Sequence, residues 1–184
     1  MRRIATIGGF LAILVVAVAA NADEIEVRDV ALRVADEGLA LDADFEFELT
    51  PRLAEVVANG VPLYFRVDFE MTRPRWYWFD DRAASRQMHL RLSYHALSRH
   101  YRLSTGPLQQ SFATLEEALN VLKRVRNWLV VERTASLSAA DYEAAVRLRL
   151  DTALLPKPFQ LSALTGRDLQ LESPWKRFIV RPPR

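Results

Sequence analysis

The sequence predicts a mainly β fold, α+β at the margin: an antiparallel, sandwich-like domain of about seven to eight strands with two short helices. Three observations support this fold class. Several long segments alternate apolar with polar residues, which is the pattern of strands that bury one face. Two shorter segments show helical spacing behind a capping residue. The glycines after residue 22 all fall between these segments, where turns are expected.

The first two strands are expected to form a hairpin. Over residues 39–49, apolar side chains alternate mainly with acidic ones, which gives a strand with one dry face and one acidic face. Upstream, the apolar parity changes between Val27 and Val30, so we expect a β-bulge near Arg28-Asp29. Asp36-Glu37-Gly38 supplies the turn between the two strands.

A short helix and two long strands are expected next. Thr50 and Pro51 suit the N-cap and the first position of a helix that ends at Asn59-Gly60. Alternation resumes over residues 63–71 and again over 87–95, and the chain then turns and returns as a further strand.

A second helix is expected over residues 115–125. Thr114 and Glu117 have the spacing of a capping box, and an apolar stripe follows them. The cations at the end of this helix would lie on its solvated face: Lys123, Arg124 and Arg126. Further strands are expected over residues 128–131 and 142–150, and one or two edge strands in the tail.

The N-terminus has the organisation of an export signal. Met1-Arg2-Arg3 precede an uncharged run over residues 4–20, and Ala20-Asn21-Ala22 then forms an A-x-A cleavage site. We therefore expect a signal peptide over residues 1–22, cleaved after Ala22, and a single domain over residues 23–184 in the periplasm or exported further. The alternative is an uncleaved helix that anchors the domain in the inner membrane.

Composition excludes several classes of function. The chain has no cysteine, which excludes disulfides, thiol catalysis and a lipid anchor on an N-terminal cysteine. The two arginines within residues 1–22 account for the formal net charge of +2, so the predicted mature domain is neutral and no nucleic-acid partner is expected. No phosphate-binding loop, dinucleotide fingerprint or nucleophile elbow occurs, and we expect neither a cofactor nor a metal. The sequence predicts no particular oligomeric state.

An acidic row is the first candidate binding surface. Asp42, Asp44 and Glu46, continued by Glu48, repeat every two residues, so their carboxylates lie about 7 Å apart on one face. The row could pair with cations of a neighbouring strand, dock a basic partner, or bind calcium. A straight strand offers poor geometry for calcium, and pairing within the sheet is the simplest interpretation. Arginines that could pair with the row are Arg33, Arg66, Arg91, Arg147 and Arg149.

A cluster of consecutive aromatic residues is the second candidate surface. Arg75 precedes Trp76, Tyr77 and Trp78, and Phe79 follows them. Neighbouring side chains of a strand point to opposite faces, so some of these rings must be exposed or covered by another segment. Covered rings would only pack the domain. Exposed rings would form a platform for sugar rings or peptide, or a belt at a bilayer surface.

These features favour a binding protein over an enzyme, and we predict no catalytic residue. The leading hypothesis is a non-enzymatic interaction module of the bacterial envelope that uses the acidic row and the aromatic cluster. The alternative is an envelope carbohydrate-active hydrolase with Asp68 and Glu70 as paired carboxylates, because these residues lie two apart on one strand face. A third hypothesis, a ligand-sensing accessory to a membrane kinase, requires a cavity between the sheets.

Several segments resemble those of a known family. They are residues 73–80, Ser93-Tyr94-His95-Ala96-Leu97-Ser98-Arg99, the helix segment from Ser111-Phe112 to Trp128, Leu155-Pro156-Lys157-Pro158-Phe159-Gln160-Leu161 and Trp175-Lys176-Arg177-Phe178. In these segments the chain resembles the exported "domain of unknown function 4390" family of proteobacteria. The resemblance implies an exported protein of unassigned activity and transfers no site residues. Members are often encoded beside a nitrogen-regulation-type sensor kinase, so the resemblance points to an envelope protein or a membrane sensor component as partner.

Overall fold

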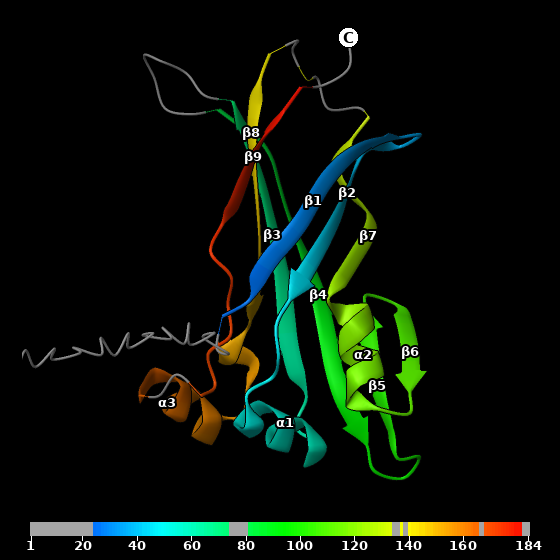
Figure 1. Ribbon diagram of the computed structural model, residues 1–184, viewed down its shortest axis with the longest axis vertical. Helices are drawn as coiled ribbons and strands as arrows, with labels where there is room; N and C mark the ends of the chain where they lie inside the picture. The colour runs from blue at the N-terminus through cyan, green and yellow to red at the C-terminus, as the bar shows by residue number, and fades with distance from the viewer. Residues whose placement is uncertain (1–23, 74–80, 134–136, 138–139, 166–167, 182–184) are drawn as a thin grey trace, which may run out of the picture.

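The computed structural model describes residues 24–73, 81–133, 137, 140–165 and 168–181. In this part of the chain, nine strands form two antiparallel sheets (Figure 1). The three-stranded sheet has the order β1 (Glu26–Ala35), β2 (Gly38–Glu46), β7 (Arg124–Glu132). The six-stranded sheet has the order β6 (Leu108–Phe112), β5 (His100–Thr105), β4 (Asp81–His95), β3 (Leu63–Arg73), β8 (Tyr142–Leu150), β9 (Lys176–Val180). The predicted mainly β, sandwich-like fold is therefore confirmed.

The core lies between the two sheets. On β3, near the middle of the larger sheet, Phe65, Phe69 and Met71 are fully buried. The opposing face of β2 contributes Leu41 and Phe45. Burial of each such side chain stabilises the fold by about 1.5–3 kcal/mol. These contacts hold the two sheets together without any disulfide, because the chain has no cysteine.

The β1–β2 hairpin has the predicted bulge and turn. The register of the two strands shifts between Val27 and Asp29, where the apolar parity of the sequence changes. Gly38 begins β2 with a φ of 147°, in the region that favours glycine. A Cβ at Gly38 would meet the backbone oxygen of Val131 at 2.0 Å, so the close approach of β7 also requires glycine.

Two of the three α-helices in the described part were predicted. In α1 (Pro51–Ala58) the hydroxyl of Thr50 accepts a hydrogen bond from the backbone N–H of Leu53 at 3.2 Å. In α2 (Leu115–Leu122) Thr114 and Glu117 form the predicted capping box. None of the described helices is long and apolar enough to cross a membrane. The predicted signal peptide, residues 1–22, lies outside the described residues.

Three details of the prediction are wrong. The sequence predicted about seven to eight strands, but Leu108–Phe112 adds β6, whose residues lack clear alternation of apolar and polar side chains. It also missed helix α3 (Lys157–Thr165), which follows the short 3₁₀ helix Thr152–Leu154. Pro158 lies in the first turn of α3, where proline costs no backbone hydrogen bond. Finally, α2 ends three residues before the predicted position, and β7 begins at Arg124.

Backbone hydrogen bonds connect the two sheets at the start of β1, and among the described residues the sheets are no longer connected in this way along the rest of β1. The backbone N–H of Ile25 donates to the carbonyl of Glu172 at 3.3 Å, and the N–H of Leu150 in β8 donates to Leu171 at 2.7 Å. Residues 171–173 therefore connect β1 to β8. Farther along, β1 is an edge of the small sheet and β9 is an edge of the large one (Figure 1). The arrangement leaves an opening between these two edges.

Candidate binding cleft

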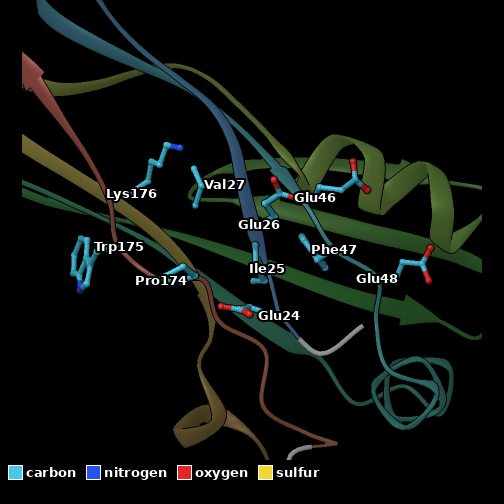
Figure 2. Close-up of a pocket in the computed structure, with 10 residues that line it drawn as sticks. All are labelled: Glu24, Ile25, Glu26, Val27, Glu46, Phe47, Glu48, Pro174, Trp175 and Lys176. Atoms are coloured by element: carbon cyan, nitrogen blue, oxygen red, sulfur yellow. The ribbon is translucent and has the colours of Figure 1, made fainter. Parts of the chain in front are cut away.

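A cleft of about 740 Å³ lies in the opening between β1 and β9 (Figure 2). Three segments line it: residues 24–27 at the start of β1, residues 46–48 at the end of β2, and residues 174–176 at the start of β9. The volume falls within the range of about 300–1,000 Å³ that is typical of ligand sites. The cleft is large enough for a small molecule, but it opens at the edges of the two sheets and is not an enclosed cavity between them.

The floor of the cleft is apolar. Ile25, Val27 and Phe47 are buried, and their side chains lie at the centre of the cleft in Figure 2. The ring of Phe47 packs against that of Phe65 in β3, with centroids 5.9 Å apart. Because this floor is part of the core, its shape is fixed by packing before any ligand arrives.

The rim of the cleft is acidic. Four glutamates line it: Glu24, Glu26, Glu46 and Glu48. Glu26 pairs with Arg28 at 3.2 Å, and Glu46 pairs with Lys123 at 3.1 Å. Glu24 and Glu48 are exposed and form no ion pair with a described residue. Lys176 is the cation among the lining residues.

Backbone hydrogen bonds fix the third wall of the cleft. Ser173 is buried; its N–H donates to the carbonyl of Leu148 at 2.9 Å, and its hydroxyl accepts from the N–H of Leu148 at 3.0 Å. This anchoring places Pro174, Trp175 and Lys176 beside the cleft. The guanidinium of Arg147 lies 4.5 Å from the centroid of the Trp175 ring, which holds that ring at the edge of the wall.

The two strands beside the cleft each present an edge. Among the described strands, β1 pairs only with β2, and β9 pairs only with β8. Unpaired backbone N–H and C=O groups along such an edge can hydrogen-bond an added extended chain. The cleft therefore combines an apolar floor, an acidic rim and backbone groups suited to a strand.

The structure divides the acidic row between the sheet and the cleft. Asp42 forms an ion pair with Arg33, as the sequence suggested, and accepts a hydrogen bond from the N–H of Asn127 at 2.8 Å. Asp44 pairs with Arg126 at 2.5 Å. Glu46 reaches the cleft.

Of the ten lining residues of the cleft, the sequence analysis placed only Glu46 and Glu48 in a candidate binding surface, and it missed the other eight, Glu24, Trp175 and Lys176 among them. Glu48 was visible as the last member of the row. Nothing local in the sequence indicates that Glu24 and Lys176 line the same cleft, since they lie far apart in the sequence.

Asp68 and Glu70 lie on the outer face of the large sheet and do not line the cleft, although Arg147, which binds Asp68, also stacks on Trp175 of the cleft wall. The carboxylate of Asp68 is bound by three guanidinium groups: those of Arg66, Arg147 and Arg149. Glu70 is half-buried and faces Ser85 and Ala145 across the neighbouring strands. Because the Asp68 carboxylate is buried beneath three arginines, a substrate cannot reach it, so this geometry gives no support to a hydrolytic pair.

The other candidate features are less informative. Arg75, Trp76, Tyr77 and Trp78 lie outside the described residues. Among the side chains that are described, no group of three or more histidines, aspartates and glutamates could hold a metal ion.

Comparison with known proteins identifies the family. The family model "Domain of unknown function (DUF4390)" matches residues 22–179. The chain belongs to this family. No curated protein and no solved structure matches it. The match shows that the resemblance inferred from the sequence is correct, and in this DUF4390 protein it covers every segment that lines the cleft.

Proposed function

We propose that this DUF4390 protein is an exported, non-enzymatic binding module of the bacterial envelope, and that its cleft holds a basic, extended segment of a partner protein. The observation that carries the proposal is the cleft itself, with its apolar floor below unpaired carboxylates and between two strand edges. The export pattern of residues 1–22 supports an envelope location.

The chemistry of the cleft selects a segment that alternates apolar and basic residues. In an extended chain, alternate side chains point to opposite sides. One set would cover Ile25, Val27 and Phe47, and the other would approach Glu24 and Glu48. Ile25, Val27 and Phe47 are already buried, so affinity comes from covering the exposed Pro174 and the half-buried ring of Trp175 beside them. The carboxylates favour basic over acidic partners and accelerate their association.

The strand edges explain why the segment should be extended. A peptide beside β1 could form main-chain hydrogen bonds along a ten-residue strand, which is the mode called β-augmentation. Such bonds do not depend on side-chain identity, so the floor and the rim would determine specificity. We propose a membrane sensor component as the partner, since family members are often encoded beside a sensor kinase.

A peptide-binding experiment tests this function. Because the chain has no cysteine, Lys176→Cys introduces a single thiol at the cleft, and an environment-sensitive dye attached there reports occupancy. The probes are two ten-residue peptides, one alternating lysine with valine and one alternating glutamate with valine. We expect the lysine peptide to bind more tightly, and the preference to shrink as salt screens the carboxylates.

A matched pair of variants locates the binding. Glu24→Gln combined with Glu48→Gln removes the two unpaired carboxylates, which should weaken binding of the lysine peptide about fivefold, from roughly 0.5 kcal/mol for each exposed charge. Glu116→Gln, an exposed change on α2 outside the cleft, should leave binding unaltered. Equal binding of the two peptides, or no effect of the double variant, would refute the proposal.

A further inference from the structure

A second pocket lies near the other edge of the large sheet, at strands β4, β5 and β6. It has a volume of about 310 Å³ and is formed between the β5–β6 hairpin, strand β4 and the junction of α2 with β7. Its lining is mainly apolar: Met88, Leu90, Leu103, Leu108, Val121, Leu122 and Val125. None of these residues lines the cleft between β1 and β9.

The pocket forms because the three-stranded sheet is too narrow to cover the whole inner face of the six-stranded sheet. The small sheet packs over the middle of the large one, and α2 covers part of the remaining inner face at β5 and β6 (Figure 1). Helix α2 buries Ala118 and Leu122 but ends there. Beyond its end, Leu108 at the start of β6 is left exposed.

Exposure of apolar side chains marks the mouth of this pocket. Leu108 is 59% exposed and Val121 is 40% exposed, and both are lining residues. Isolated exposed apolar residues are common on proteins. Two that border one apolar pocket are the arrangement expected where an apolar ligand enters.

The charged residues that line the pocket are cationic. Arg124 and Arg126 line the pocket, and no carboxylate does. Arg126 is engaged, since it donates to the carbonyl of Ala43 at 3.1 Å and pairs with Asp44. Arg124 lies opposite Asp44 in the β2–β7 register, but it is exposed and forms no ion pair with a described residue. It is therefore available to bind an anionic group at the mouth, with the amide of Gln110 among the other lining groups.

We propose that this pocket binds a single acyl chain that ends in a carboxylate, such as a medium-chain fatty acid. The apolar walls take the chain, which carries no group that needs a hydrogen bond. Arg124 takes the carboxylate, because a guanidinium can donate two parallel hydrogen bonds to it. The proposal does not depend on peptide binding in the cleft, since the two sites share no residue.

A titration with charge-matched amphiphiles tests it. Dodecanoate and dodecyltrimethylammonium have the same alkyl chain and opposite head-group charges. Below the concentrations at which they form micelles, we expect saturable binding of dodecanoate in calorimetry and a rise in the unfolding temperature of the full-length protein. Dodecyltrimethylammonium should bind at least tenfold more weakly.

Two variants and a control assign the binding to this pocket. Arg124→Gln should weaken dodecanoate binding about tenfold, because it removes a charge-assisted hydrogen bond. Leu108→Glu should weaken it further, since it places a negative charge at the mouth. Leu97→Glu is the matched control: Leu97 is 94% exposed at the β4–β5 turn and lies outside the pocket, so binding should be unchanged.

Three results would overturn the proposal. The first is equal affinity for the two amphiphiles, which would indicate adsorption to apolar surface alone. The second is dodecanoate binding that is unchanged by both Arg124→Gln and Leu108→Glu. The third is the absence of saturable dodecanoate binding. Circular dichroism confirms that each variant is folded, and folding is expected because the three changed residues are exposed.

Discussion

Replacing Asp68 with asparagine should destabilise the protein by about 3 kcal/mol. The Asp68 side chain is only 6% exposed in the middle of β3. Its Oδ2 accepts hydrogen bonds from Nε of Arg147 at 3.0 Å and from Nε of Arg149 at 3.1 Å. Its Oδ1 lies 3.0 Å from Nε of Arg66. The Asp68 carboxylate thus contacts three guanidinium groups, one of which, that of Arg66, also pairs with Asp151 at 3.7 Å.

The size of the effect follows from these contacts. A hydrogen bond to a charged group contributes about 1.5–3 kcal/mol, and removing one partner of a buried ion pair costs about 3–5 kcal/mol. The arginine side chains are 19–29% exposed, so water screens part of the repulsion that Asp68→Asn would leave. The amide oxygen of asparagine also keeps one acceptor. Both considerations place the loss near the lower end of the range.

Urea denaturation measures this loss. For a chain of this size the free energy of unfolding falls by about 2 kcal/mol per molar urea, so the midpoint should drop by about 1.5 M. Glu70→Gln is the matched control, since Glu70 lies on the same strand face and has no ion pair among the described residues. Its effect should stay within about 0.5 kcal/mol.

A second variant shows whether unbalanced charge is the cause. Adding Arg149→Met to Asp68→Asn removes one of the guanidinium groups left without a carboxylate, so it should recover about 1 kcal/mol. A midpoint for Asp68→Asn within 0.3 M of the parent, on the order of the error of such a measurement, would refute the structural role. Loss of activity on a glycan substrate with unchanged stability would instead favour the hydrolase hypothesis.

Two further predictions concern a turn and the aromatic cluster. Gly38→Ala should destabilise the protein by more than about 2 kcal/mol in urea denaturation, because its Cβ would meet the backbone of β7. Gly60→Ala should cost only about 1 kcal/mol, since Gly60 has a positive φ but open space around it; equal costs would contradict this. Trp76→Ala and Trp78→Ala should weaken capture of the partner in a pull-down while leaving the melting temperature nearly unchanged. If partner capture and the melting temperature fall together, the two rings pack the core and do not form a binding surface.

Local pattern was enough to predict most of the fold. The bulge between Val27 and Asp29, the cap at Thr50 and the capping box at Thr114 all follow from residue chemistry within a few positions. The errors occur where local pattern is ambiguous. In α3, Pro156 and Pro158 resemble a loop until the tolerance of the first helical turn for proline is considered.

The candidate site was less predictable, because its partners come from separate segments. Alternation placed Asp44 on the outer face, but its partner Arg126 was assigned to a helix. The early end of α2 puts Arg126 in β7, beside an irregular register that includes Asn127 with a φ of 50°. The presence of Glu24 and Lys176 in one cleft depends on the backbone hydrogen bond from Ile25 to Glu172, which no local pattern encodes.

The unequal size of the two sheets explains where both proposed sites lie. The three-stranded sheet packs over the middle of the six-stranded sheet and leaves part of its inner face uncovered near each edge. At one side the rim carries glutamates, and at the other it carries arginines. The zero net charge of residues 23–184 therefore does not exclude local groups of charged residues, acidic at one site and basic at the other. At close range a ligand responds to the charges near its site and not to the net charge of the protein. A protein with no net charge can therefore select a basic peptide at the cleft between β1 and β9 and an anionic acyl chain at the pocket beside β5 and β6.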